Sequence, residues 1–116
     1  MFKSAHNKFI LLDEQNYILC QSQDSEVDGF APVSIKLNKY GRRVLYFKHG
    51  KNTFFIKDIY DNGKINFSFS DQSNLVVTEF DDYLSIGISD KFLSAKKDDT
   101  IGLAPHLKGW EKFKTN

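Results

Sequence analysis

A run of basic side chains near the middle of the chain is the strongest candidate for a binding surface. Residues 29–57 contain several lysines and two adjacent arginines but no acidic residue. The planar guanidinium group of arginine matches carboxylate or phosphate groups, and a neighbouring tyrosine can anchor a protein partner. We therefore predict a partner-binding site that consists of Lys36, Lys39, Tyr40, Arg42, Arg43, Lys48 and Lys51. The alternative is that these long side chains cover apolar strand surface while their charged ends stay in water.

The charges of the whole chain also occur in blocks. Residues 13–28 carry acids and no Lys or Arg, residues 58–90 carry seven acids and one lysine, and the tail is basic again. Two interpretations remain open. The blocks could form opposed surface potentials that steer a charged partner, or folding could bring them together so that they neutralise one another. The net charge of +1 argues against a general nucleic-acid binder.

The other polar residues form no recognisable catalytic or metal-binding motif. The histidines His6, His49 and His106 are far apart in the sequence, and Cys20 is the only cysteine. A metal site needs several His, Cys or carboxylate ligands held close together. The sequence has no Gly-x-Ser-x-Gly elbow and no glycine-rich phosphate loop. We therefore expect no catalytic residues, no metal, no cofactor and no enzymatic activity, and the apolar neighbours of Cys20 favour a buried thiol.

Short β-strands must position these residues, because aromatic and β-branched side chains suit a half-buried pleated surface. The clearest hairpin lies in the middle, where residues 54–60 run into Asp61-Asn62-Gly63 and then into residues 64–69. After the turn, apolar residues alternate with polar ones, which is the period of a strand with one buried face. Asn-Gly is the pair typical of a type I′ turn, so we predict that turn type here.

Similar segments occur in three sets of four. The predicted strands are residues 2–5, 8–12, 17–21 and 33–37; then 44–48, 53–57, 64–69 and 75–80; then 83–88, 92–95, 100–104 and 110–114. A self-similar unit of about 38 residues is typical of a fold built from repeats. We therefore predict an all-β protein, specifically a β-trefoil, as a single domain over residues 1–116. Its repeats are expected at about 1–41, 42–81 and 82–116; a small sandwich and a lipocalin-like barrel are the alternatives.

The third repeat carries the most specific residues. Its segments 91–95, Lys-Phe-Leu-Ser-Ala, and 110–113, Trp-Glu-Lys-Phe, resemble the second and fourth strands in the repeats of fascins and hisactophilin. The opening residues 2–6 are similar to the first strand and turn of that family. The resemblance implies an actin-binding type of β-trefoil with actin or another filament as partner, and it implies that Trp110 is a core residue. The chain lacks the many histidines of hisactophilin, so a pH-switched attachment is not implied.

These observations favour a non-catalytic trefoil that binds another macromolecule, most simply a protein with an acidic surface. One alternative is a small cytosolic inhibitor or immunity protein that neutralises a toxin or enzyme. Another is a lectin-like trefoil that binds carbohydrate through exposed aromatic residues, for which Tyr17, Tyr40 and Tyr60 are the candidates. Binding of the basic run to an anionic membrane is a weaker option. No signal-like or membrane-spanning apolar run is present, so we expect a cytoplasmic monomer without a transmembrane segment.

Overall fold

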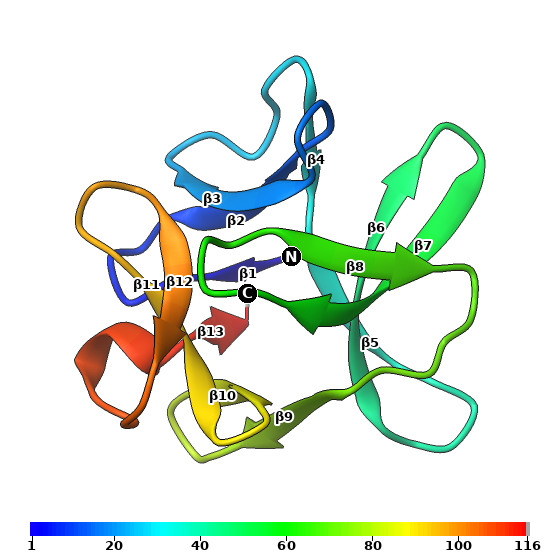
Figure 1. Ribbon diagram of the computed structural model, residues 1–116. Coiled ribbons are helices and arrows are strands. Elements are labelled where there is room, and N and C mark those ends of the chain that lie inside the picture. The colour runs from blue at the N-terminus through cyan, green and yellow to red at the C-terminus, as the bar shows by residue number, and fades with distance from the viewer. Residues whose placement is uncertain (116) are drawn as a thin grey trace.

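The computed structural model describes residues 1–115, and it is all-β, as the sequence predicts (Figure 1). Within these residues, short strands are joined by tight turns, and the helical structure consists of one 3-10 turn, η1 (Gly109–Glu111). The strands are β1 (Phe2–Lys3), β2 (Phe9–Asp13), β3 (Ile18–Ser22), β4 (Phe30–Pro32), β5 (Ser34–Leu37), β6 (Arg43–His49), β7 (Asn52–Ile59), β8 (Ile65–Ser68), β9 (Leu75–Glu79), β10 (Leu84–Ile88), β11 (Lys91–Ala95), β12 (Ile101–Ala104) and β13 (Lys114–Thr115).

The strands form three antiparallel sheets that follow one another along the chain. The first has the order β13-β1-β2-β3, with β4 also paired to β2; the second is β5-β6-β7-β8, and the third is β12-β11-β10-β9. The first sheet joins the two ends of the chain, because Phe2 of β1 is opposite Thr115 of β13. Figure 1 shows the sheets arranged around a common centre, with both termini close together.

All three sheets contribute to one apolar core. Strands with alternating sequences, such as β8, place their apolar residues inward because successive side chains point to opposite faces. Phe2 from the first strand and Phe113 from near the C-terminus are both 0% exposed, and their rings meet edge to face at 5.7 Å. The fully buried large side chains are Phe2, Ile10, Leu11, Leu12, Leu19, Leu45, Ile56, Ile59, Ile86, Leu93, Ile101 and Phe113.

Three hairpins, one from each sheet, meet at Gly63. The N–H of Leu19 in β3 donates to the Gly63 carbonyl at 2.9 Å. A Cβ on Gly63 would lie 2.7 Å from the carbonyl oxygen of Ile101 in β12, so only glycine fits between the two neighbouring strands. Bridges between Ile18 and Lys64, and between Cys20 and Thr100, connect the three hairpins further. This junction links the three sheets through backbone contacts.

The predicted hairpin over residues 54–69 is confirmed, but its turn differs from the type I′ prediction. Gly63 has a φ of +84°, whereas Asn62 is not among the residues with positive φ. The Gly63 N–H donates to the Tyr60 carbonyl at 2.9 Å, and the Tyr60 N–H donates to the Lys64 carbonyl at 2.8 Å. This is the pattern of a longer hairpin loop that ends in one left-handed glycine. The prediction failed because Asn-Gly is compatible with the two-residue type I′ turn and also with this longer loop. The contacts of Gly63 with β3 and β12 decide which of the two forms.

The predicted strand at residues 110–114 is also wrong over most of its length. Residues 109–111 form η1, because Glu111 caps its own turn: its Oε1 accepts a hydrogen bond from the Lys108 N–H at 2.8 Å. Only Lys114 and Thr115 pair as the short strand β13. The structure adds β4 between the predicted strands at residues 17–21 and 33–37, and each of the other predicted strands overlaps an observed one.

Candidate functional site

The loop between β5 and β6 holds the centre of the predicted binding site in a fixed conformation. The side-chain oxygen of Asn38 accepts hydrogen bonds from the N–H groups of Tyr40 and Arg42, at 2.9 and 3.0 Å. Gly41 supplies the positive φ of +76° that the turn requires. The side chain of Asn38 also donates to the carbonyl oxygen of Asp71 at 3.1 Å, which ties the loop to the segment before β9.

This fixed loop presents Tyr40 and Arg42 to solvent. Tyr40 is 60% exposed, although its ring is large and mostly apolar. Beside the two residues is a hollow of about 530 Å³, which Lys57 and Arg43 also line. The hollow is also lined by polar residues of the segment that leads into β9, which are Gln72, Ser73 and Asn74.

A second hollow, of about 540 Å³, is also lined by Arg42 and lies between the start of β6 and β9. Its rim carries two exposed aliphatic side chains, Leu37 at 58% and Val76 at 64%. β9 is the last strand of its sheet, so one of its edges does not pair within that sheet. We call the solvent-accessible set around both hollows the hairpin surface; it consists of the exposed residues Leu37, Tyr40, Arg42 and Val76 and the half-buried Lys57.

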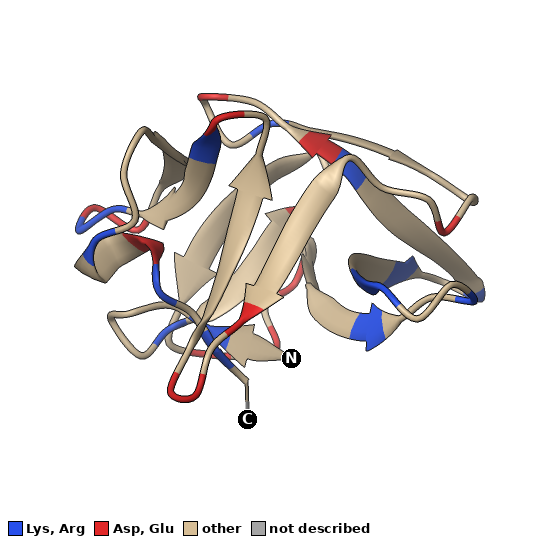
Figure 2. Ribbon diagram, turned by 90° about the horizontal axis from the view of Figure 1, so that it is seen from below, with Lys and Arg blue, Asp and Glu red and all other residues tan. Residues whose placement is uncertain are grey.

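Arg43 lies next to this surface but is already paired. Its Nη2 is 2.6 Å from Glu79 Oε2, and the two side chains are 37% and 56% exposed. This pair joins the basic block of the sequence to the acidic block at residues 58–90. Asp61 pairs in the same way with Lys91 of the basic tail, and Glu14 of the first acidic block contacts the His49 ring. Figure 2 accordingly shows basic and acidic positions on most sides of the molecule, which favours the interpretation that the blocks neutralise one another.

The remaining predicted residues lie in three places. Lys39 lies in the same loop, with its Nζ 5.2 Å from the centre of the Tyr40 ring. Lys36 lies on β5, where its Nζ is 4.9 Å from the Tyr46 ring, so it covers aromatic strand surface. Lys48 and Lys51 lie at the β6–β7 turn, at the opposite end of β6. Seven strand residues span roughly 20 Å, so these two lysines do not belong to the hairpin surface.

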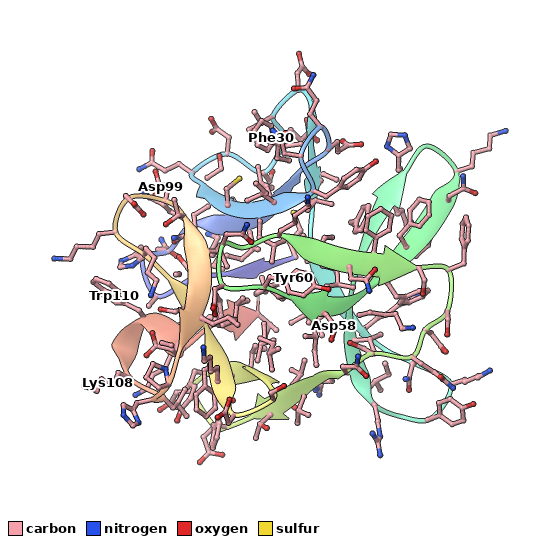
Figure 3. The ribbon with its side chains drawn as sticks, viewed as in Figure 1. Phe30, Asp58, Tyr60, Asp99, Lys108 and Trp110 are labelled. Atoms are coloured by element: carbon pink, nitrogen blue, oxygen red, sulfur yellow. The ribbon has the colours of Figure 1, made fainter. Side chains whose placement is uncertain are left out.

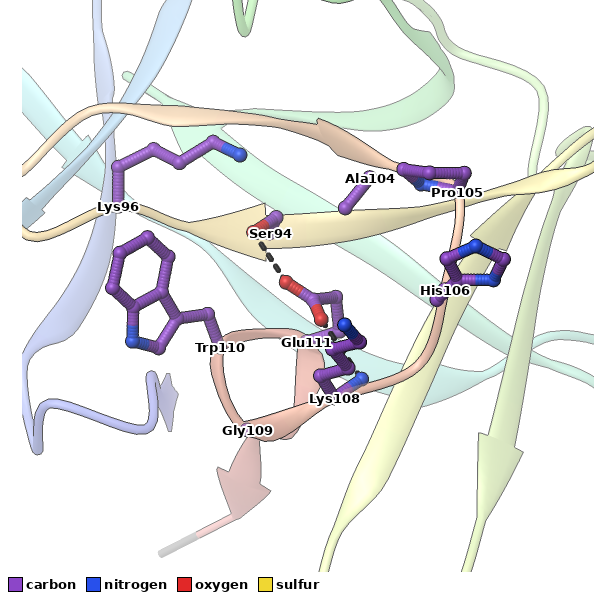
Figure 4. Close-up of a pocket in the computed structure, with 9 residues that line it drawn as sticks. All are labelled: Ser94, Lys96, Ala104, Pro105, His106, Lys108, Gly109, Trp110 and Glu111. Carbon is purple, nitrogen blue, oxygen red and sulfur yellow. Dashed lines mark hydrogen bonds between the residues drawn. The ribbon is translucent and has the colours of Figure 1, made fainter.

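The structure contains a further pocket that no sequence motif indicated. It has a volume of about 480 Å³ and lies between β11, β12 and η1 (Figure 4). The buried carboxylate of Glu111 lies at the pocket and accepts a hydrogen bond from the Ser94 hydroxyl at 2.5 Å. We call it the Glu111 pocket; its lining residues are Ser94, Lys96, Ala104, Pro105, His106, Lys108, Gly109, Trp110 and Glu111.

Trp110, which the family resemblance implied to be a core residue, is instead 39% exposed and lies at this pocket. Figure 3 shows Trp110 and Lys108 at the outer edge of the molecule. The turn η1 reverses the expected pattern, because Glu111 and Phe113 point inward and Trp110 points outward. A signal was present in the sequence: Trp110 and Phe113 are three residues apart, so a regular strand would place their side chains on opposite faces, and only one of them could enter the core.

The histidines and the cysteine occupy separate places. His6 Nε2 is 2.9 Å from the carbonyl oxygen of Ala95, and within residues 1–115 no three His, Cys, Asp or Glu side chains gather closely enough for a metal. Cys20 is half-buried rather than buried. Burial raises the pKa of its thiol, and the negative charges of Asp13 and Asp99 raise this pKa further.

Searches against protein-family models, curated proteins and solved structures found no match to the chain. Residues 1–115 contain no helix with the length and apolar character needed to cross a membrane.

Proposed function

We propose that the chain is a non-catalytic protein-binding module and that the hairpin surface contacts its partner. The observation that carries this proposal is the fixed loop that exposes Tyr40 and Arg42 between two hollows. Tyrosine and arginine contribute much of the affinity in protein interfaces, especially next to pockets from which water is excluded. A loop that is already ordered loses little conformational entropy when it binds.

The charges of the hairpin surface favour an acidic partner. Arg42 and Lys57 line the same hollow, and neither forms an ion pair with another residue in the range 1–115. Carboxylates of a partner could pair with both groups and would speed association. The exposed Leu37 and Val76 would supply apolar contacts beside them.

We also propose that the fold is a β-trefoil. Three successive sheets, three hairpins that meet at Gly63 and the closure of β13 onto β1 support this assignment. With the resemblance of the third repeat to fascins, the trefoil favours actin or another filament protein as partner. A small inhibitor or immunity protein is the alternative, and it would use the same surface to block a toxin or enzyme.

Affinity capture from native lysate, together with co-sedimentation with actin filaments, tests this proposal. Arg42→Glu and Lys57→Glu should each weaken partner binding about tenfold. Lys48→Glu is the matched control, because Lys48 lies at the opposite end of β6, and it should leave binding unchanged. A filament protein bound by the wild type favours the family-type role, and one stoichiometric non-filament partner favours the inhibitor. Equal capture by all variants would contradict the hairpin surface as the binding site.

A further inference from the structure

The Glu111 pocket is a second candidate binding site, and it shares no lining residue with the two hollows of the hairpin surface. Its volume of about 480 Å³ lies within the range of roughly 300–1,000 Å³ that is usual for small-molecule sites. Figure 4 shows the Glu111 carboxylate between Trp110 and Lys96 on one side and His106 and Pro105 on the other. The chemistry of these groups determines which ligand the pocket suits.

Glu111 supplies hydrogen-bond acceptors that the protein does not use fully. Its Oε2 accepts from Ser94 Oγ at 2.5 Å and its Oε1 accepts from the Lys108 N–H at 2.8 Å. A carboxylate can accept about four hydrogen bonds, so each oxygen retains capacity for one more donor. The residue is only 5% exposed and has no ion-pair partner within residues 1–115. Two hydrogen-bond donors from a ligand would occupy the remaining acceptor positions of this buried carboxylate.

Trp110 supplies a flat apolar wall. Trp110, the one tryptophan of the chain, is 39% exposed as a residue, and it lines the pocket. The ring is held in place from outside the pocket, because the His6 ring meets it edge to face with centres 5.7 Å apart. A fixed, exposed indole face can pack against the C–H face of a ring-shaped ligand at little entropic cost.

Two lysines supply positive charge beside the carboxylate. Lys96 and Lys108 both line the pocket, and neither forms an ion pair with another residue in the described chain. The stem of Lys96 is positioned by β12, since a Cβ on Gly102 would lie 3.4 Å from Lys96 Cε. With two ammonium groups and one carboxylate, the pocket carries a net positive charge, so it favours an anionic ligand over an amine.

We propose that the Glu111 pocket binds a saccharide through a sugar ring that carries a carboxylate group. Sugar hydroxyls both donate and accept, so they can donate to Glu111 and accept from Lys96 or Lys108. The C–H face of the ring would lie on the Trp110 indole, and the ligand carboxylate would pair with Lys96. A purely aromatic ligand would leave the remaining acceptors of Glu111 without donors, and an ammonium ligand would meet two like charges.

The single tryptophan makes this proposal directly testable, because the side-chain N–H signal of Trp110 is the only indole signal in the NMR spectrum. The full chain is titrated with methyl glucuronide and, separately, with methyl glucoside. We expect saturable movement of the indole signal with the glucuronide, and about tenfold weaker binding of the uncharged glucoside. No movement with either sugar would overturn the proposal, and equal binding of both would overturn the preference for a carboxylate.

Two variants identify the groups that recognise the sugar. Lys96→Gln and Glu111→Gln should each weaken glucuronide binding about tenfold. Lys112→Gln is the matched control, because Lys112 is next to Glu111 in sequence but lies over the Tyr83 ring and not in the pocket. If Glu111→Gln fails to fold, Lys96→Gln remains decisive, since Lys96 is partly exposed and forms no ion pair. Unchanged binding in Lys96→Gln would overturn the assignment, and Arg42→Glu should leave this titration unaffected.

Discussion

The Ser94 hydroxyl and the Glu111 carboxylate are hydrogen-bonded at 2.5 Å, with exposed fractions of 0% and 5%. Ser94 lies on β11 and Glu111 ends the turn η1, so this contact holds the C-terminal segment against the third sheet. Because Glu111 also accepts from the Lys108 N–H, the same carboxylate fixes the turn itself. Trp110 is directed outward as a consequence, and the Glu111 pocket forms beside it.

Replacing Ser94 with alanine should destabilise the protein, because one oxygen of a buried carboxylate would lose its donor. The expected loss in the free energy of unfolding is about 1–3 kcal/mol, measured by urea denaturation. Ser70→Ala is the control: Ser70 is exposed, and its replacement should change the free energy by less than about 0.5 kcal/mol. An unchanged stability for Ser94→Ala would mean that water replaces the hydroxyl without cost.

Replacing Gly63 with alanine should be far more damaging than the same change at Gly50. Both glycines have positive φ, +84° and +62°, which costs alanine about 1–2 kcal/mol. Only at Gly63 would the new Cβ also collide with backbone, 2.7 Å from the Ile101 carbonyl oxygen, whereas Gly50 has open space. We expect a loss of about 3–5 kcal/mol for Gly63→Ala, measured by thermal and urea unfolding. Similar losses for both variants would show that the three hairpins do not meet tightly at Gly63.

Truncation of Trp110 should cost little stability, and truncation of Phe113 should cost much. Phe113 is 0% exposed and packs on Phe2, so Phe113→Ala should lose about 3–5 kcal/mol of unfolding free energy. Trp110 is 39% exposed, so Trp110→Ala should lose only about 1 kcal/mol. The pair is compared by the midpoint of urea unfolding. The opposite order would restore the core role that the family resemblance implied for Trp110.

The thiol of Cys20 should react slowly at neutral pH. Burial, together with the charges of Asp13 and Asp99, raises its pKa, and only the thiolate is strongly nucleophilic. The rate of alkylation by iodoacetamide should therefore increase with pH in both states, but the midpoint of this increase should lie at a higher pH in the native protein than in the urea-unfolded protein. The raised pKa also means that this group's contribution to stability is present below the unfolded pKa and is lost as pH rises through the folded one. If the alkylation rate of the native protein rose at the same pH as that of the unfolded protein, or at a lower pH, the raised pKa of Cys20 would be contradicted.

The strands could be predicted because their signals are local. Alternating apolar residues around Phe67 predict β8 from the period of a pleated strand, and the structure places β8 at Ile65–Ser68. The turn type at Asn62-Gly63 could not be predicted in this way. It depends on how closely β3 and β12 approach Gly63, and those strands are distant in the sequence.

The binding site was predictable only in part for the same reason. Tyr40 and Arg42 are close in sequence and share one loop, so their grouping follows from the chain itself. Lys48 belongs to the same basic run, but the extended strand β6 carries it away from that loop. Lys57 and Val76 were not predicted, because only the packing of the second sheet beside β9 brings them to the hairpin surface.

The sequence alone determined that the chain is all-β, where most strands lie, and that Tyr40 and Arg42 are presented together, since these features depend on residues a few positions apart. The tertiary structure decided which charged blocks neutralise one another, and it decided that Trp110 faces outward while Glu111 is buried. Both outcomes depend on contacts between distant segments, such as the bond from Ser94 to Glu111. A local pattern cannot encode them, because each partner's position is set by the packing of the whole core.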